Sequence, residues 1–295
     1  MRIYHASLTL RTLLHYCKLY PEKRSNVLKS FGMLDYELLG FCKDHRSKMG
    51  SLIFDSGTWT LNNAKSDVAA RINLPAYKDY MLTFAHHFDF YFNFDSVFSD
   101  DTDEINYQNQ LAMEEAGLKP VPVVHDVDRD EIDYYIDKGY TTVALGSKQN
   151  SNPDVLARAF EKFSSAGIRV HLFGNMKFSS ISNFPIWSCD TTAWAQRGLW
   201  GFIYYWNPHR PDLDQTDKIY MEEYMDITKK YRFMYSNYEY RSDLDEYLYN
   251  DLKITTSDLY GPDGTFYKGL ANLHFYVKLE QTVTQIHRKK GFDTE

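Results

Sequence analysis

Short apolar runs recur along this chain, and each of them ends abruptly in a polar residue or a glycine. Two of the ends are aspartates, Asp55 in LIFDSGTW and Asp190 in IWSCDTTAW. The other runs are RIYHAS, FYFNFD, PVPVVHD, TVALGS, RVHLFG and GFIYYWN. Parallel barrels deliver reactive side chains from such strand ends, because the loop after each strand faces the same cavity. The eight runs therefore predict an α/β fold, a (β/α)8 TIM-type barrel that carries an active site.

Helix signals fill the segments between several of these runs. The clearest are Ile105–Ala116, Asp130–Lys138 and Pro153–Ala166, and a glycine directly follows each of them. Glycine adopts the left-handed conformation that ends a helix at little cost, so these glycines are typical helix stops. Repeated strand–helix–strand units with right-handed crossovers make neighbouring strands parallel.

The first part of the chain is less regular. Leu8–Tyr20 and Lys65–Ala85 are predicted helices. We expect Asn26–Phe41 to form a helical or loop excursion ahead of the strand Ser51–Asp55.

From Asp212 onward the chain is charged and rich in tyrosine, and three further helices are predicted there, Gln215–Phe233, Leu244–Leu252 and Leu273–His287. We expect residues 1–211 to form the catalytic barrel core. Residues 212–295 would add the last barrel helix and a helical C-terminal extension, within a single domain overall.

Composition argues against several classes of protein. Hydrophobic residues make up 43% of the 295 positions and charged residues 25%, as in globular proteins. The sequence contains no run of 18 or more apolar residues, so it predicts no membrane span. The first residues also lack a charged stretch followed by an uninterrupted apolar core and a small-residue cleavage site, the pattern of a signal peptide. The three cysteines are too few and too scattered for a disulfide framework or a four-ligand zinc site. We therefore expect a cytoplasmic protein with no membrane partner.

The net charge of −7 argues against a protein that coats nucleic acid through bulk charge. Basic residues nevertheless cluster at 18–29, 43–48, 229–232 and 288–290. These clusters could be solvated helix faces, or they could contact phosphates around a basic mouth on an acidic body. Composition does not choose between the two.

Three strand-end aspartates, Asp55, Asp95 and Asp190, would converge on one cavity of the predicted barrel. Asp55 could instead cap its own turn in the D-S-G triplet, and Asp190 could cap the following helix. Two carboxylates suffice for substitution at a sugar C1′, one as the nucleophile and one as the proton carrier. Three could instead bind Mg²⁺, and the spacing alone does not separate these possibilities.

Other strand ends carry histidines and glycines. His125 and His171 lie on different predicted strands and could form a metal pair, or each could be a hydrogen-bonded core residue. Gly146, Ser147 and Gly174 would leave backbone amides accessible to a planar ligand. The sequence contains no P-loop, no dinucleotide-binding glycine fingerprint and no nucleophile elbow.

Taken in order, these segments resemble the tRNA-guanine transglycosylase superfamily. The motifs that carry the resemblance are FDSGTW, FNFD, NQLAMEEAGLKPVPVVH, GYTTVALGS, RVHLFG and WSCDTTAW, which together cover roughly residues 51–201. The match is closer to the diverged branch, often encoded near or within viruses (phage-type), that inserts 7-deazaguanines into DNA. Thr58 replaces the second glycine of the usual D-S-G-G, and the cysteine cluster that binds zinc in the tRNA enzymes is missing, which favours DNA over tRNA.

The resemblance implies a role for each matching residue. Asp190 would be the nucleophile that bonds to C1′, and Asp55 the general acid and base. Asp95 would read the guanine-like edge. Trp59 and Phe173 would stack on the base, and Gly146 and Ser147 would present amides to its carbonyl. The remaining predicted substrate-binding residues are Ser56, His125 and Gly174.

We therefore expect a pentosyltransferase that exchanges guanine in DNA for a free 7-deazaguanine base, without cofactor or metal. Exchange on tRNA is the runner-up. Further alternatives are a non-catalytic nucleic-acid-binding partner subunit and a Mg²⁺-dependent barrel enzyme that uses the three aspartates. The resemblance also admits a homodimer.

Overall fold

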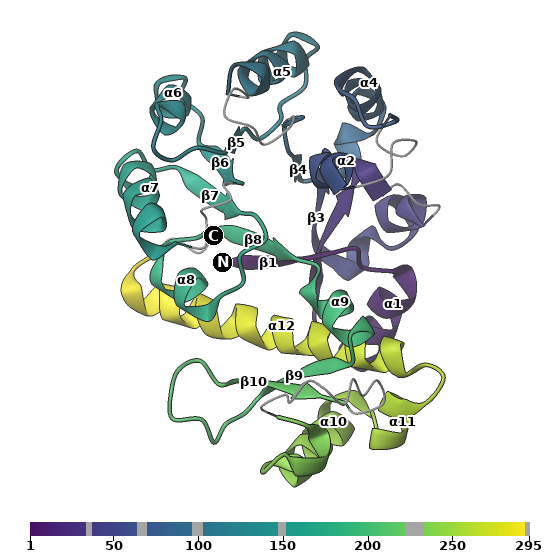
Figure 1. Ribbon diagram of the computed structural model, residues 1–295. Coiled ribbons are helices and arrows are strands. Elements are labelled where there is room, and N and C mark those ends of the chain that lie inside the picture. The colour runs from purple at the N-terminus through teal and green to yellow at the C-terminus, as the bar shows by residue number, and fades with distance from the viewer. Residues whose placement is uncertain (34–36, 64–69, 96–102, 147–151, 222–232, 293–295) are drawn as a thin grey trace. The chain divides into compact units, whose positions relative to one another are not determined.

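Eight parallel strands form one curled sheet in the computed structural model, which describes residues 1–33, 37–63, 70–95, 103–146, 152–221 and 233–292. The order across the sheet is β4-β3-β2-β1-β8-β7-β6-β5 (Figure 1). The strands are β1 (Arg2–Ala6), β2 (Ser25–Ser30), β3 (Met49–Asp55), β4 (Phe90–Tyr91), β5 (Val123–Val124), β6 (Thr142–Leu145), β7 (Arg169–Leu172) and β8 (Ser188–Thr191).

The two edge strands of this sheet meet, so the sheet closes on itself. Phe92, just after β4, pairs in parallel with Val121, just before β5. The Val121 amide donates to the Tyr91 carbonyl at 2.8 Å, and the Asn93 amide donates to the Val121 carbonyl at 2.9 Å. Together with the alternating helices, this confirms the predicted (β/α)8 TIM-type fold.

Helices alternate with the strands along the chain and lie on the outside of the barrel (Figure 1). The glycine stops predicted after three of them are confirmed, since Gly117, Gly139 and Gly167 all have positive φ. The barrel helices are α2 (Thr58–Asn63), α4 (Leu74–Phe84), α5 (Asp103–Glu115), α6 (Glu131–Asp137), α7 (Pro153–Ser165) and α8 (Phe178–Asn183).

One barrel strand was missed by the sequence analysis. Residues 25–30 form β2, between β1 and β3, where a helical or loop excursion over Asn26–Phe41 was expected. The run SNVLKS contains only two apolar residues, Val27 and Leu28, so it lacks the apolar signal of the other strands. Lys29 points its ammonium at the Phe41 ring, 4.1 Å from the centroid, and thereby packs a charged residue outside the barrel.

One predicted barrel strand belongs elsewhere. GFIYYWN contains β9 (Phe202–Trp206), which pairs in antiparallel register with β10 (Thr216–Tyr220) in a separate sheet. The predicted helix Gln215–Phe233 is therefore wrong at its start, and residues 222–232 lie outside the described structure. Aromatic residues favour any half-buried strand, so the apolar run predicted a strand correctly but could not specify its sheet.

The barrel interior is filled by side chains. One cluster of buried residues from neighbouring strands contains Tyr4, Ala6, Leu28, Ile53, Phe92, Val123 and Ala144. Phe90, Val121 and Phe173 pack against it. Because this packed layer blocks the middle of the barrel, polar side chains can gather only at the strand ends.

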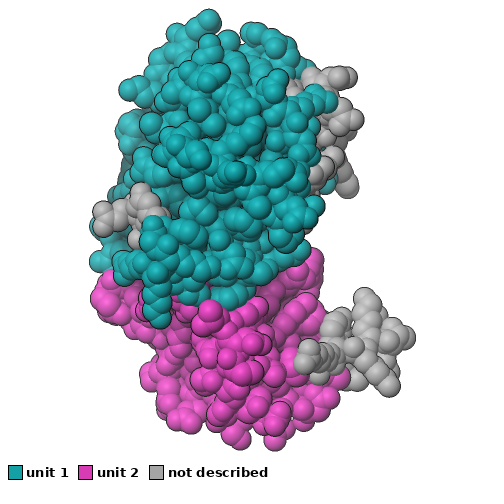
Figure 2. All heavy atoms as spheres, turned by 90° about the vertical axis from the view of Figure 1, so that its left-hand side faces the viewer, with its two compact units in different colours: residues 1–10, 24–191, 286–295 teal, residues 11–23, 192–285 magenta. Residues whose placement is uncertain are grey.

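The chain divides into two compact units, which Figure 2 colours separately. Unit 1 comprises residues 1–10, 24–191 and 286–295 and contains the barrel, and unit 2 comprises residues 11–23 and 192–285. The predicted division at residue 211 stays a prediction, since compactness does not measure independent folding. No described helix is both long and apolar enough to cross a membrane.

Within unit 2, Asn272 joins helical segments to the small sheet. Its side chain accepts from the Tyr204 amide at 2.7 Å and donates to the carbonyls of Phe202 and Trp194 at 3.1 and 3.2 Å. The remaining α-helices in the described residues are α1 (Leu10–Leu19), α9 (Ala193–Leu199), α10 (Arg241–Leu252), α11 (Thr256–Tyr260) and α12 (Gly264–Lys290). The helices predicted at Leu244–Leu252 and Leu273–His287 are thus confirmed, the second within the longer α12.

The D-S-G loop after β3 is locked against the turn after β2. Gly57 has a φ of +85°, and a Cβ at this position would lie 2.3 Å from the Gly32 backbone nitrogen. Gly117 has the same φ, but a Cβ there would meet nothing within 4 Å.

This pair of glycines allows a matched test of the loop. Gly117→Ala is expected to lower the free energy of unfolding by about 1–2 kcal/mol, because alanine disfavours positive φ. Gly57→Ala should lower it by roughly a further 1–3 kcal/mol, because the backbone contact leaves no room for a methyl group. Denaturant unfolding of both variants measures the difference. Equal losses would show that the loop yields to the methyl group.

Candidate active site

Three carboxylates lie at the C-terminal ends of barrel strands in unit 1. Asp55 ends β3, Asp95 follows β4 by four residues, and Asp190 lies within β8. The pKa of Asp55 is raised to about 7 by burial first, then by the negative charge of Asp95, with a smaller contribution from Asp190. Asp95 and Asp190 therefore lie close enough for their charges to act on Asp55, while the shared cavity stays a prediction.

Asp55 is held by the end of β2 and by its own loop after β3. Its Oδ2 accepts hydrogen bonds from the Ser30 hydroxyl at 3.0 Å and from the Gly57 amide at 2.9 Å. The second bond is the turn cap that the D-S-G triplet suggested, and both bonds oppose the rise in its pKa. Ser30 was not foreseen, because β2 itself was not recognised.

Asp95 gathers two other predicted residues. Its Oδ1 accepts from the Ser56 hydroxyl at 2.8 Å, and its Oδ2 lies 3.2 Å from His125 Nε2. The Ser56 hydroxyl is in turn 2.9 Å from the Thr58 hydroxyl. Ser56 and His125, from the loops after β3 and β5, thus both orient the Asp95 carboxylate.

His125 also contacts two residues that sequence analysis missed. Asn106 on α5 places its Nδ2 3.2 Å from His125 Nδ1, and a Glu131 oxygen lies 3.9 Å from the same nitrogen. Burial lowers the pKa of His125, but its hydrogen bond with Asp95 and the negative charges of Asp95 and Glu131 raise it to about 9. Glu131 gave no signal in the sequence because it lies in the acidic run DVDRDEID.

Asp190 lies beside β7. Its Oδ1 accepts from the Gly174 amide at 3.2 Å, an amide that the positive φ of Gly174 makes available. The same oxygen lies 3.5 Å from Nε2 of His171, which is fully buried and shares its Nδ1 with the Ser188 hydroxyl at 2.8 Å. Gly174 therefore contributes a backbone donor to Asp190, and its expected contact with a planar ligand stays a prediction.

The predicted base-binding residues are only partly brought together. A Cβ at Gly146 would lie 3.0 Å from Val123 Cγ1 and 3.7 Å from both His125 Nε2 and the Phe173 ring, so glycine lets the backbone pack closely against these side chains. Trp59 lies on α2 with 65% of its surface exposed, and no ring contact joins it to Phe173 among the described residues. Ser147 lies outside the described residues.

The metal alternatives find no support in the described geometry. No group of three or more His, Cys, Asp or Glu side chains is arranged to hold a metal ion in the parts of unit 1 and unit 2 that the structure describes. His171 forms a hydrogen bond with Ser188 through Nδ1, and its ring centroid lies 4.8 Å from those of Phe92 and Phe173. It is therefore a core histidine, and the pair with His125 does not form a site.

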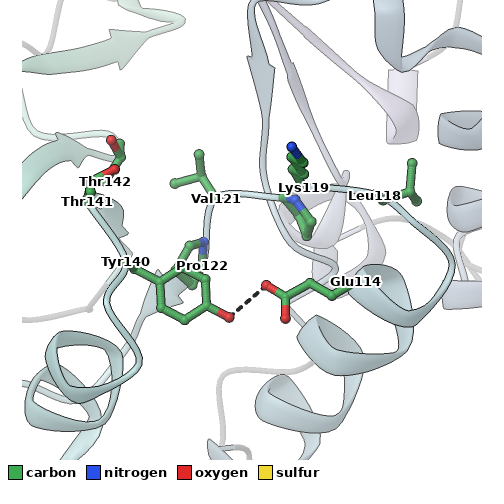
Figure 3. Close-up of a pocket in the computed structure, with 9 residues that line it drawn as sticks. Glu114, Leu118, Lys119, Val121, Pro122, Tyr140, Thr141 and Thr142 are labelled. Carbon is green, nitrogen blue, oxygen red and sulfur yellow. Dashed lines mark hydrogen bonds between the residues drawn. The ribbon is translucent and has the colours of Figure 1, made fainter.

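A surface pocket of about 400 Å³ lies at the other end of the barrel (Figure 3). One wall is closed by the Tyr140 hydroxyl, which donates to Glu114 at 2.7 Å. The other residues that line it are Leu118, Lys119, Pro120, Val121, Pro122, Thr141 and Thr142. They precede β5 and β6, and in barrels this end contributes to stability whereas chemistry occurs at the C-terminal strand ends. We therefore take the aspartates, and not this pocket, as the candidate active site.

No known family model matches this sequence, and no curated protein is significantly similar to it.

The raised pKa of Asp55 predicts a pH dependence of stability. The folded state favours the protonated carboxyl, so this stabilisation is complete below about pH 4 and is lost as the pH rises through about 7. Asp55→Asn, which cannot ionise, should gain on the order of 2–4 kcal/mol relative to the wild type between pH 4 and pH 8. Unfolding free energies across this range measure the gain.

The exposed Asp137→Asn variant at the end of α6 serves as the control and should show no such gain. A constant difference between Asp55→Asn and the wild type at all pH values would contradict the assignment.

Proposed function

We propose that this chain is a base-exchange transglycosylase that replaces guanine in DNA with a 7-deazaguanine derivative through a covalent aspartyl–sugar intermediate. The observation that carries the proposal is the pair Asp55 and Asp190. They are electrostatically coupled, come from separate strand ends, and have different surroundings. Two carboxyl groups whose environments differ in this way can divide the roles of acid–base and nucleophile.

The proposed reaction has two balanced halves. The Asp190 carboxylate attacks the sugar C1′, the bond from C1′ to guanine breaks, and the departing base takes the proton of Asp55. The incoming 7-deazaguanine then returns a proton to Asp55, its nitrogen bonds to C1′, and the Asp190 carboxylate leaves. A pKa of about 7 suits Asp55 to both transfers, because it can hold or release the proton near neutral pH.

The neighbouring residues fit the recognition of a purine-like base. The Asp95 carboxylate, fixed by Ser56 and His125, can accept hydrogen bonds from the N–H groups of a guanine edge. The half-buried Phe173 ring offers a stacking surface, which is worth about 1–3 kcal/mol per base. A base in duplex DNA would have to be flipped out to reach this depth.

DNA is favoured over tRNA by the cysteines. The sequence holds only Cys17, Cys42 and Cys189, which are buried and lie too far apart along the chain to be a closely spaced three-cysteine zinc site. The resembling tRNA enzymes use such a site. Exchange on tRNA remains the second candidate, and a silent nucleic-acid-binding subunit is the third. The presence of both Asp55 and Asp190 argues against the silent subunit.

The test is nucleoside mass spectrometry of DNA and tRNA from cells that express this chain and make 7-deazaguanine precursors. We expect a deazaguanosine in DNA that falls by at least about 100-fold in Asp190→Asn, since the amide is a poor nucleophile. Asp137→Asn is the matched control and should retain the product.

The outcomes separate the candidates. A product in tRNA alone would select the tRNA enzyme, and no product in either pool would leave the silent subunit. Full activity of Asp190→Asn would refute the nucleophile assignment.

A further inference from the structure

Glu131 is the first residue of α6, and its side chain is completely buried. Its Oε2 accepts hydrogen bonds from two consecutive backbone amides, those of His125 at 2.7 Å and Asp126 at 2.9 Å. A buried carboxylate is costly unless its oxygens are paired. Its burial against the loop after β5 therefore calls for an explanation beyond helix formation.

The other oxygen of Glu131 faces the imidazole of His125. Oε1 lies 3.9 Å from His125 Nδ1 and accepts no hydrogen bond from the described residues. On the opposite side of the ring, Nε2 lies 3.2 Å from Asp95 Oδ2. The His125 ring, with 8% of its side chain exposed, thus lies between two carboxylates that are 10% and 0% exposed.

We propose that Glu131 is a positioning residue of the active site, which fixes the backbone of His125 and holds its imidazole as a cation against Asp95. The charge assignment is independent of the ligand. Only its effect on base exchange rests on the proposed function.

The surroundings of His125 favour the cation. Asp95 faces the ring from the loop after β4 and Glu131 from α6, while Asp126, next in the chain, pairs with Arg129 at 3.3 Å. These two facing carboxylates outweigh burial and raise the pKa of His125 to about 9. Asn106 faces Nδ1 of His125 from α5. Rotating its carboxamide by half a turn exchanges the positions of the nitrogen and the oxygen, and the oxygen then accepts a hydrogen bond from Nδ1–H of the protonated ring.

This arrangement couples Glu131 to Asp55 through His125 and Asp95. The negative charge of Asp95 raises the pKa of Asp55. An imidazolium bonded to Asp95 offsets part of that charge. If Glu131 loses its charge, the cation weakens, Asp95 acts on Asp55 with less compensation, and the pKa of Asp55 rises further.

A purely structural role for Glu131 predicts something different. If it only anchors the loop through its two backbone bonds, glutamine should replace it without electrostatic consequence, because the amide oxygen accepts the same two bonds. Glu131→Gln therefore separates anchoring from charge.

The experiment is an NMR titration of the His125 ring in the full chain, with the resonance assigned by its loss in His125→Gln. Glu131→Gln should weaken proton binding to His125 roughly tenfold or more, a fall of at least about one pKa unit. Glu114→Gln, at a helical glutamate bonded to Tyr140 and Gln110, is the matched control and should leave His125 unchanged. A smaller fall in Glu131→Gln would overturn the proposal.

The wild type provides a second test that does not depend on the folding of a variant. Nitrogen-15 spectra at pH 7 should show both ring nitrogens of His125 protonated. One unprotonated nitrogen would overturn the proposal.

Base exchange supplies the readout of the coupling. In the pH–rate profile of Glu131→Gln, the limb that reports the ionisation of Asp55 should move to higher pH. A limb that stays in place or moves to lower pH would refute the coupling. If the wild type performs no exchange, the proposed function fails, but the NMR titration still decides the role of Glu131.

Discussion

The closure of the barrel between β4 and β5 is the contact on which the rest of the site depends. It consists of a single parallel pairing, Phe92 with Val121, and the backbone hydrogen bonds beside it. Asp95 continues from one side of this seam and His125 from the other, and their 3.2 Å contact spans it. Neighbouring side chains reinforce the same region, since the Tyr77 hydroxyl donates to the Phe92 carbonyl and Asn93 donates to that of Asn106. The pairing that closes the barrel therefore also brings Asp95 and His125 within hydrogen-bond distance.

The ends of the barrel strands could be predicted from the sequence more reliably than the identity of all eight strands. Asp55, Asp95 and Asp190 could be predicted because each follows an apolar run, and a run that ends in a carboxylate is visible without a structure. β2 could not be predicted, because it contains only two apolar residues, and its last residue, Ser30, contributes a hydrogen bond to Asp55 rather than apolar burial. β9 was mistaken for a barrel strand because an aromatic run predicts a strand but not its partner.

The surrounding layer of the site was less predictable than the carboxylates. Asn106 and Glu131 reach His125 from helices, and helical polar residues are ordinarily solvated. The side chain of Glu131 is fully buried, but several acidic residues stand beside it in the sequence. Only tertiary packing distinguishes Glu131 from these neighbours. The left-handed glycines were predictable as helix stops, whereas the approach of Gly57 to Gly32 depends on two loops from strands that are distant in the sequence.

The seam is also short, since β4 and β5 contain two residues each. A region held by so few backbone bonds is a natural place for local opening, at a free energy below that of global unfolding. Such an opening would separate Asp95 from His125 while leaving the other strands paired. Heating would then take apart the candidate site before the secondary structure of the barrel is lost.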